Sequence, residues 1–337
     1  MTTPEWNPGT LMQASGYYWR TCTLHTGVKL DVFTVIGSDT LTATEVAARI
    51  QSDERATATL LNALSALGLL IKTGDQYRNS DPARQFLCKD SERYIGFMIM
   101  HHHHLMESWN RMDEAILSGK PTRSRSSFSD EARRESFLMG MFNTAMAQAP
   151  DISRSINLDG CETLLDLGGG PGTYAIHFCL QNPSLRATVF DLPTTRPFAE
   201  KTIERFSVQD RVRFMPGDFV ADDLDDLTET FDAAWLSHIL HGEGPEDASR
   251  VIQKAARALK PGGRIFIHEF ILDANMDGPL FPALFSLNML VGTPSGQSYS
   301  QDQFCDMFTA HGIENIQRLG YVGPTESGIL SGTKKRS

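Results

Sequence analysis

The 337-residue sequence lacks several features that would assign it to common classes of protein. No apolar run approaches the ~20 residues that a membrane-spanning helix needs. The first residues, "MTTPEWNPG", lack the basic and apolar regions of a secretory signal peptide. Lys and Arg total 31 against 41 Asp and Glu, so there is no basic excess of the kind that nucleic-acid-binding surfaces show. We therefore expect a soluble, cytoplasmic protein without membrane or nucleic-acid partners.

Cysteine is also sparse. The five cysteines are scattered and odd in number, and no C-x-x-C pair occurs. This pattern indicates neither a disulfide framework nor a zinc knuckle. We expect reduced and mostly buried thiols, as is usual inside cells.

Four successive histidines, His101 to His104, are a candidate metal motif. On a helix, four successive side chains point in four directions, so they cannot all bind one ion. His103 and Glu107 share a face at i, i+4 spacing, but a site would need a further ligand from elsewhere. We expect no metal in this protein, and we expect these histidines to line a pocket or to contact another subunit.

Residues 1–100 have the patterns of a small, mainly helical domain. The segment "TATEVAARI" (42–50) begins like a capping box, in which the side chains of Thr42 and Glu45 each accept the other's backbone N–H. A second apolar helical pattern follows over 53–70, and "LIKTGDQYRNS" then alternates and turns at "TGD", as a β-hairpin does. Helix, helix and hairpin in this order predict a winged-helix module. Residues 101–155 continue with helical patterns as a linker, split by the polar segment "GKPTRSRSSFSDEARR" (119–134).

From residue 156 to 337, apolar strand-like runs alternate with helical segments. The runs are "TLLDL", "ATVFDL", "VRFMPGD", "DAAWLSHIL" and "RIFIHEFIL". Because they are apolar without alternation, they are typical of parallel strands buried on both faces. The pattern predicts a doubly wound α/β domain. A Pro-Gly-Gly turn is expected just before the fifth strand, and "IENIQRLGYV" with "GILSGTKK" is expected to form a closing hairpin.

The first strand of this domain runs into a glycine-rich turn, with Asp166 followed by Gly168, Gly169 and Gly170. Such a turn lets a ligand approach the backbone closely. Asp191 ends the next strand about 20 residues on, where an acid can accept hydrogen bonds from a ribose. These features alone fit NAD as well as other nucleosides. The D-x-G-G-G-x-G form, the later "PGDF" and the "LKPGG" turn favour another cofactor.

This series of motifs resembles the class I S-adenosylmethionine-dependent methyltransferases. The whole chain is similar to the small-molecule O-methyltransferases that include caffeate and acetylserotonin methyltransferases, with their bacterial relatives. The resemblance implies S-adenosylmethionine as cofactor, a Rossmann-like methyltransferase domain, and a homodimer formed through an N-terminal winged-helix dimerisation domain. It also implies a set of cofactor-binding residues: Asp166, Gly168, Gly169 and Gly170 at the methionine end, Asp191 and Leu192 at the ribose and adenine, Asp218 and Phe219 at the adenine, and Ser237 where the plant enzymes have lysine.

Two histidines occur in "AAWLSHILHGEGPED" (233–247), at the end of the fourth strand. Transfer to a hydroxyl requires removal of its proton, and histidine suits that task. The resemblance implies that His241 is the general base and that Glu269 flanks and orients it. His238 takes the place of a tryptophan, and we expect it to line the pocket at most. Gly242 and Ser298 replace two acids of the family, so the base has less support here.

The acceptor molecule is not named by the sequence. The resemblance implies that the 101–155 region closes over the acceptor and that a set of residues contacts it: Phe142, Asn143, Met146, His238, Met289 and Thr293. A hydroxyl is the expected acceptor. Alternatives are a thioether or thiol, as in a methylthio-hydroxy acid, or a carbon, positioned without a base. A winged-helix regulator that binds DNA is the remaining alternative, although residues 53–70 carry few of the polar side chains that read bases.

Overall fold

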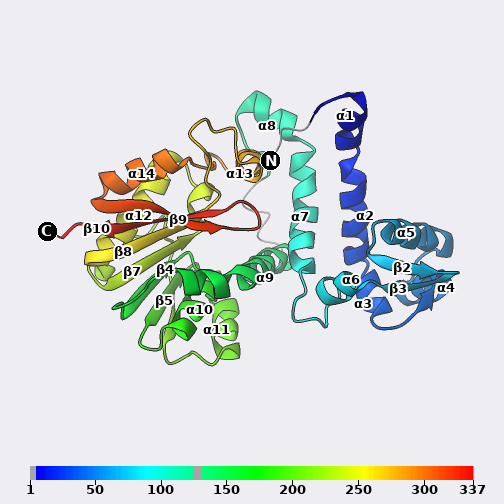
Figure 1. Ribbon diagram of the computed structural model, residues 1–337, viewed down its shortest axis with the longest axis horizontal. Helices are drawn as coiled ribbons and strands as arrows, with labels where there is room; N and C mark the ends of the chain where they lie inside the picture. The colour runs from blue at the N-terminus through cyan, green and yellow to red at the C-terminus, as the bar shows by residue number, and fades with distance from the viewer. Residues whose placement is uncertain (1–4, 124–130, 337) are drawn as a thin grey trace. The chain divides into compact units, whose positions relative to one another are not determined.

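The computed structural model describes residues 5–123 and 131–336. The chain divides into two compact units (Figure 1). The first consists of the described residues of 1–106 and 131–144, and the second of those of 107–130 and 145–337. Residues 124–130 of the predicted polar loop lie outside the described residues. Among the described residues, none of the helices combines the length and apolar character needed to cross a bilayer.

The first unit is mainly helical, as expected. Its elements are α1 (Pro8–Ser15), α2 (Tyr17–Lys29), α3 (Val32–Ile36), β1 (Leu41–Thr42), α4 (Ala43–Ile50), α5 (Glu54–Ala66), β2 (Leu70–Thr73), β3 (Gln76–Asn79), α6 (Asp81–Phe86) and most of α7 (Gly96–Trp109). Thr42 and Glu45 form the predicted capping box at the start of α4. The predicted hairpin is β2–β3, which pairs with β1 in an antiparallel sheet of order β1-β3-β2. The comparison with a winged helix stays a prediction.

The second unit contains a seven-stranded sheet of order β6-β5-β4-β7-β8-β10-β9. Its strands are β4 (Thr163–Leu167), β5 (Arg186–Asp191), β6 (Val212–Pro216), β7 (Phe231–Ser237), β8 (Leu259–Glu269), β9 (Ile313–Val322) and β10 (Gly328–Lys334). The pairs from β6 to β8 are parallel, and β10 is antiparallel to both of its neighbours. The predicted α/β domain and closing hairpin are confirmed. The strand order reverses between β4 and β7, where ligands bind in such sheets.

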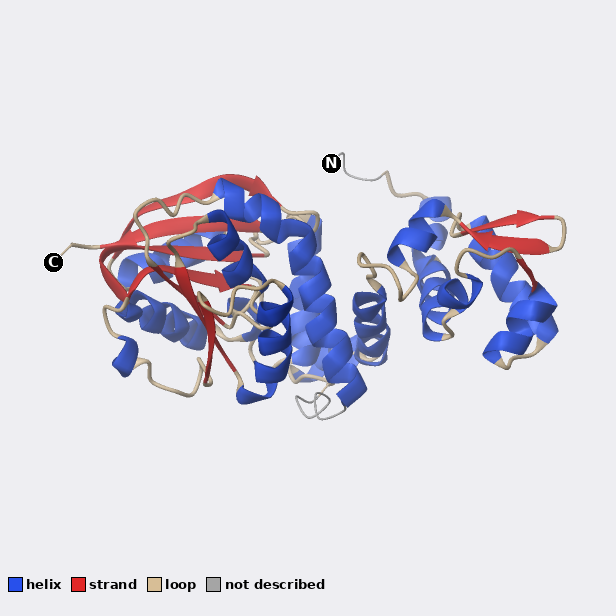
Figure 2. Cartoon of the chain, turned by 90° about the horizontal axis from the view of Figure 1, so that it is seen from below, coloured by secondary structure: helices blue, strands red, loops and turns tan. Residues whose placement is uncertain are grey.

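Helices cover both faces of this sheet (Figure 2). They are the C-terminal part of α9 (Glu131–Ser155), α10 (Thr173–Gln181), α11 (Arg196–Arg205), α12 (Pro245–Ala258) and α14 (Gln301–Ala310). The same unit also contains α8 (Met112–Ser118) and α13 (Leu280–Gly292), which contact each other. One core cluster unites α12 and α14 with one face of the sheet, and a second unites α9, α10 and α11 with the other. In β7, Ala234 and Leu236 belong to the first cluster, while Ala233 and Trp235 belong to the second. This explains why the strand is apolar at successive positions.

One boundary differs from the prediction. The "PGG" segment does not precede the fifth strand but lies inside β8, which begins at Leu259. Phe231 pairs with Leu259 and Ala233 with Arg264, so residues 260–263 form an irregularity between two stretches of regular pairing. Gly262 has a φ of 80° there, a conformation that glycine adopts without steric cost.

Candidate active site

The glycine-rich turn follows β4, at the point where the strand order reverses. Gly168 and Gly170 have φ values of 67° and 55°, in the region that favours glycine. A Cβ added at Gly169 would lie 2.5 Å from Cγ of Asp166, and one at Gly168 would lie 2.6 Å from Cγ2 of Ile239. The glycines therefore let the turn fold closely over Asp166.

Asp166 is a buried carboxyl beneath this turn, 1% exposed. Its Oδ2 accepts a hydrogen bond from the Ala175 N–H at 3.2 Å, and its Oδ1 has no hydrogen-bond partner among the described residues. Burial raises the pKa of Asp166 to about 7, and the charge of Asp191 adds to that shift. A buried acid with one free oxygen is stabilised by a ligand that donates hydrogen bonds or carries positive charge.

Asp191 ends β5 beside the same turn. Its Oδ2 accepts the Gly170 N–H at 2.8 Å, and its Oδ1 accepts the Leu192 N–H at 2.7 Å and the Thr195 hydroxyl at 2.9 Å. These contacts fix the carboxylate at the carboxyl edge of the sheet. Leu192 leaves 44% of its surface exposed there. The two residues predicted to hold a ribose and an adenine thus lie next to the glycine turn.

Asp218 and Phe219 follow β6. Oδ1 of Asp218 accepts the Val220 N–H at 2.9 Å, so this carboxylate caps a tight turn of its own chain. A Cβ at Gly168 would lie 3.1 Å from Cε1 of Phe219. Phe219 therefore lies against the glycine turn, and its contact with an adenine stays a prediction.

Ser237 ends β7, and its hydroxyl lies 3.1 Å from Nδ1 of His268 on the neighbouring strand. Nε2 of His268 lies 3.0 Å from the Ser327 hydroxyl. Burial holds the pKa of His268 well below its ordinary value, so this ring is neutral and fully hydrogen-bonded. This contact fixes the Ser237 side chain at the end of β7. The role of His268 was not predicted from the sequence.

His241 and Glu269 meet at the carboxyl ends of β7 and β8. The parallel register places Ser237 opposite His268, which brings the residues that follow each strand together. Nδ1 of His241 lies 2.8 Å from Oε2 of Glu269. Oε1 of Glu269 accepts the backbone N–H groups of Leu240 at 3.0 Å and of His241 at 3.3 Å. The predicted pair is therefore in direct contact, and the carboxylate also fixes the backbone that carries the histidine.

The charge of Glu269 decides which ring nitrogen carries the proton. Burial alone would raise the pKa of this carboxyl, which is 1% exposed, but the nearby His241 and His238 outweigh burial and hold it well below its ordinary value. An ionised carboxylate only accepts hydrogen bonds. Nδ1 of His241 is therefore the donor, and in the neutral ring Nε2, on the other side, carries the lone pair.

His238, which we expected only to line the pocket, is a second imidazole at the same carboxylate, and its contact with Glu269 was not predicted. Its Nδ1 lies 3.5 Å from Oε2 of Glu269 and makes no hydrogen bond among the described residues. Its backbone has a φ of 56°, which is uncommon for a residue other than glycine. The positive φ could not be deduced from the apolar strand pattern of this segment.

Aromatic side chains surround the two histidines. The Phe270 ring centroid lies 4.4 Å from that of His238 and 6.0 Å from that of His241. Phe285 meets His241 edge-on at 4.7 Å, and Phe281 lies 5.0 Å from Phe270. Phe281 and Phe285 come from α13, so this helix forms an apolar wall beside the candidate base.

Four further predicted positions on this side of the site differ in what they do. Met289 is buried, and its carbonyl accepts the Thr293 hydroxyl at 2.9 Å. That hydroxyl in turn accepts the Gly296 N–H at 2.8 Å, so it already has two partners within the chain. Ser298 is buried and donates to the Pro282 carbonyl at 2.9 Å. A Cβ at Gly242 would meet no atom within 4 Å.

The three acceptor residues predicted on α9 fall in different units. Phe142 is buried and Asn143 donates to the Tyr94 carbonyl, both within the first unit. Met146 belongs to the second unit, where its sulfur lies 3.4 Å from Nε2 of His177. Their contact with an acceptor stays a prediction.

The histidine run His101–His104 lies on α7. Nε2 of His103 lies 3.2 Å from Nζ of Lys29, and its ring meets that of His25 edge-on at 5.6 Å. Candidate metal-binding geometry among the described residues falls instead on His238, His241 and Glu269, whose ligand atoms lie within 4.8 Å of one another. The direct contact between His241 and Glu269 accounts for that spacing without an ion.

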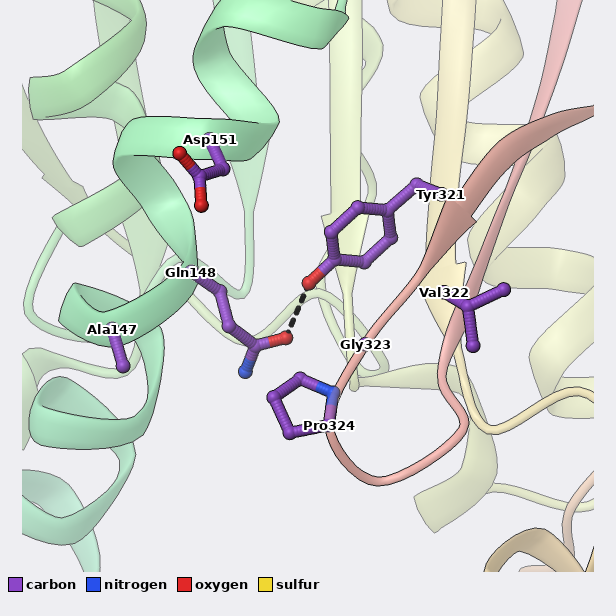
Figure 3. A pocket seen from close by; sticks show the side chains of 7 residues that line it. All are labelled: Ala147, Gln148, Asp151, Tyr321, Val322, Gly323 and Pro324. Carbon is purple, nitrogen blue, oxygen red and sulfur yellow. Dashed lines mark hydrogen bonds between the residues drawn. The ribbon is translucent and has the colours of Figure 1, made fainter.

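A separate hollow of about 300 Å³ lies between α9 and the β9–β10 hairpin (Figure 3). Its lining residues are Ala147, Gln148, Asp151, Tyr321, Val322, Gly323 and Pro324. The Tyr321 hydroxyl donates to Oε1 of Gln148 at 2.6 Å, and the Tyr321 ring packs edge-on against His268 at 5.6 Å.

Comparison with known proteins gives consistent matches. Residues 118–314 match a family described as an O-methyltransferase domain, and residues 12–89 match an O-methyltransferase dimerisation domain. The chain is 31% identical to a 3-hydroxy-5-methyl-1-naphthoate 3-O-methyltransferase of Streptomyces sahachiroi, covering 94% of this chain and 92% of that protein. It is 30% identical to a tetracenomycin polyketide 8-O-methyltransferase of Streptomyces glaucescens, covering 94% of each. The structure of an O-methyltransferase family protein from Burkholderia thailandensis superposes with a TM-score of 0.89 at 28% identity, covering 99% of this chain and 100% of that one.

Proposed function

The chain belongs to the family of S-adenosylmethionine-dependent O-methyltransferases, and we propose that it methylates a hydroxyl of a small aromatic molecule with His241 as the general base. The observation that carries this proposal is the 2.8 Å contact between Nδ1 of His241 and Oε2 of Glu269 at the carboxyl edge of the sheet. The predicted transferase function and cofactor agree with the family. The residue roles and the acceptor class are proposals.

The residues around the glycine turn fit the cofactor. Asp166 offers a buried oxygen without a partner among the described residues, which suits the ammonium group at the amino acid end of the molecule. Asp191 and the exposed Leu192 suit the ribose and the adenine, and Phe219 adds an aromatic face. When bound, S-adenosylmethionine supplies an electrophilic methyl group on a sulfonium.

His241 would accept the hydroxyl proton of the acceptor at Nε2. Glu269 holds the other nitrogen as an N–H donor, so the lone pair stays on the side away from the carboxylate. The same carboxylate stabilises the imidazolium that forms. Glu269 contacts both the imidazole ring and the backbone N–H of His241. Because the ring is fixed in this way, little reorganisation is needed when the proton moves.

An aromatic acceptor suits the surroundings of the base. Phe270, Phe281 and Phe285 form an apolar wall whose rings lie 4.5–6.0 Å from one another, which favours stacking and edge contacts with a flat ring. One named relative is a hydroxynaphthoate O-methyltransferase, and the other is an 8-O-methyltransferase of tetracenomycin polyketide synthesis. A thioether acceptor needs no base, and the ordered His–Glu pair therefore favours a hydroxyl over that alternative.

The first unit supports association of two copies. Residues 12–89 match a dimerisation domain, which favours a homodimer over the DNA-binding alternative. The helices α1 and α2 expose large apolar side chains, among them Met12 at 73% and Trp19 at 66%. We propose that a second copy of this chain covers them.

The test is methyl transfer to a panel of hydroxynaphthoates, followed by mass spectrometry of the product, with wild type, His241→Ala and a His311→Gln control. We expect a methyl ether from the wild type and a loss of about 10²–10⁴-fold in kcat/KM for His241→Ala, with the Kd of S-adenosylhomocysteine unchanged. The control should resemble wild type, because His311 contacts Ser249 outside the site. Undiminished turnover by His241→Ala would refute the role of the base, and no transfer to any hydroxyl would refute the acceptor class.

A further inference from the structure

His238 and His241 face one carboxylate from two sides. Oε2 of Glu269 lies 2.8 Å from Nδ1 of His241 and 3.5 Å from Nδ1 of His238. The two ring centroids are 6.1 Å apart. A base held by one acid needs only one of these histidines, so the position of the second requires its own explanation.

Two aromatic rings and a backbone hydrogen bond hold the His238 ring in place. The rings of His268 and Phe270 each lie 4.4 Å from it, and its backbone N–H donates to the His268 carbonyl at 2.9 Å. The left-handed backbone, with a φ of 56°, costs free energy that the surrounding contacts must offset. This arrangement fixes the direction in which the ring points.

The free edge of the ring carries Nε2. Nδ1 of His238 is buried, yet the side chain as a whole is 22% exposed. The exposed part therefore belongs to the opposite edge, and the same reasoning applies to His241, which is 14% exposed with its Nδ1 on Glu269. The site thus presents two Nε2 atoms from neighbouring rings, both bordered by Phe270.

The charges favour an anion at the second position. Glu269 supplies one negative charge, and Nδ1 of each of the two histidines faces it. His268 is held neutral and contributes no charge. With its Nδ1 turned toward Glu269, a protonated His238 ring would donate its Nε2–H in a charge-assisted hydrogen bond to an anionic oxygen brought by the ligand.

We propose that His238 is a specificity-determining residue that binds an anionic oxygen, such as a carboxylate, on the same ring system as the hydroxyl that is methylated. The acceptor class is then an aromatic hydroxy acid rather than a neutral phenol. This inference rests on the proposed function for the placement of the hydroxyl at His241, but the anion subsite itself is a property of His238 and Glu269.

The experiment is calorimetric binding of 2-naphthoate and of its neutral counterpart 2-naphthamide to the full chain saturated with S-adenosylhomocysteine. We expect wild type to bind the carboxylate at least about tenfold more tightly than the amide. His238→Phe keeps the aromatic packing and should reduce that ratio to near one. His238→Gln keeps a hydrogen-bond donor and should retain part of the preference for the carboxylate. The control His311→Gln should retain the full preference.

Equal binding of the two probes by wild type, or a ratio that survives in His238→Phe, would overturn the inference. The measurement is independent of methyl transfer. A preference for the carboxylate that depends on His238, together with no transfer to any hydroxyl, would support the anion subsite and contradict the proposed function.

Discussion

The backbone of Gly296 lies directly against that of His241. A Cβ at position 296 would be 2.5 Å from the His241 carbonyl oxygen and 2.6 Å from Oγ1 of Thr293. The loop after α13 therefore packs closely against the backbone of the candidate base. Thr293 was predicted to contact the acceptor, but its hydroxyl is occupied in shaping this loop.

Gly296→Ala is expected to lower kcat by about 10–100-fold, because the added methyl group displaces the backbone of His241 and a shift near 1 Å has effects of this size. Steady-state kinetics with a hydroxynaphthoate, beside the Kd of S-adenosylhomocysteine, test this. The Kd should not change. The control is Gly320→Ala in β9, where a Cβ meets no atom within 4 Å. Equal kcat for the two variants would contradict the close contact.

Glu269→Gln is expected to reduce kcat/KM by about 10²–10⁴-fold, since an amide neither fixes the proton on Nδ1 of His241 nor stabilises the imidazolium. The amide oxygen can still accept the backbone N–H groups of Leu240 and His241, so the fold should persist by circular dichroism. The matched control is Glu326→Gln, whose carboxylate accepts the Phe281 N–H at 3.0 Å. A loss of less than threefold in Glu269→Gln would show that the acid does not position the base.

Asp166→Asn is expected to change the pH dependence of stability. The pKa of Asp166 is raised to about 7 in the folded chain. Below pH ~4 the carboxyl is protonated in the folded and the unfolded chain, and it does not destabilise the wild type. Above pH 7 it is ionised in both, and burying the charge destabilises the wild type to the full extent. The free energy of unfolding of the variant relative to wild type should therefore rise from pH 5 to pH 8, by up to about 3 kcal/mol. Denaturant unfolding at the two pH values measures this. A difference independent of pH would contradict the raised pKa.

The same substitution is expected to weaken cofactor binding. The free Oδ1 of Asp166 is the group that suits the cationic end of S-adenosylmethionine, and an asparagine lacks its charge. Calorimetry with S-adenosylhomocysteine should show a Kd at least about tenfold higher, the size of one charge-assisted hydrogen bond. An unchanged Kd would remove Asp166 from the proposed cofactor site.

The local pattern was sufficient for much of the fold. Continuous apolar runs predicted the parallel strands because both of their faces are buried, as the division of Ala233 and Ala234 between two core clusters illustrates. The capping box at Thr42 and Glu45 was readable because both partners lie within four residues. The irregularity at 260–263 was not, since it depends on how β8 pairs with β7.

In the candidate site, too, some contacts could be predicted from the sequence and others depend on how the strands pair. The contact between His241 and Glu269 was expected from the family resemblance, and the proximity of Asp191 to the glycine turn from motif spacing. The second contact of Glu269, with His238, depends on a positive φ and on the pairing of Ser237 with His268 across two strands. Neither quantity is encoded in a local pattern. Ser298, where the resemblance implies a second acid, is buried and donates a hydrogen bond to the Pro282 carbonyl.

The apolar surface of α1 and α2 gives the last prediction. Met12 and Trp19 are 73% and 66% exposed, and such side chains are stabilised when a second copy covers them. Light scattering should find wild type as a dimer, and Met12→Glu combined with Trp19→Glu should shift it to monomer, because two buried charges per chain oppose association. Leu180→Glu on α10, where Leu180 is 46% exposed, is the control and should leave the dimer intact. A dimer that persists in the double variant would place the interface on another surface.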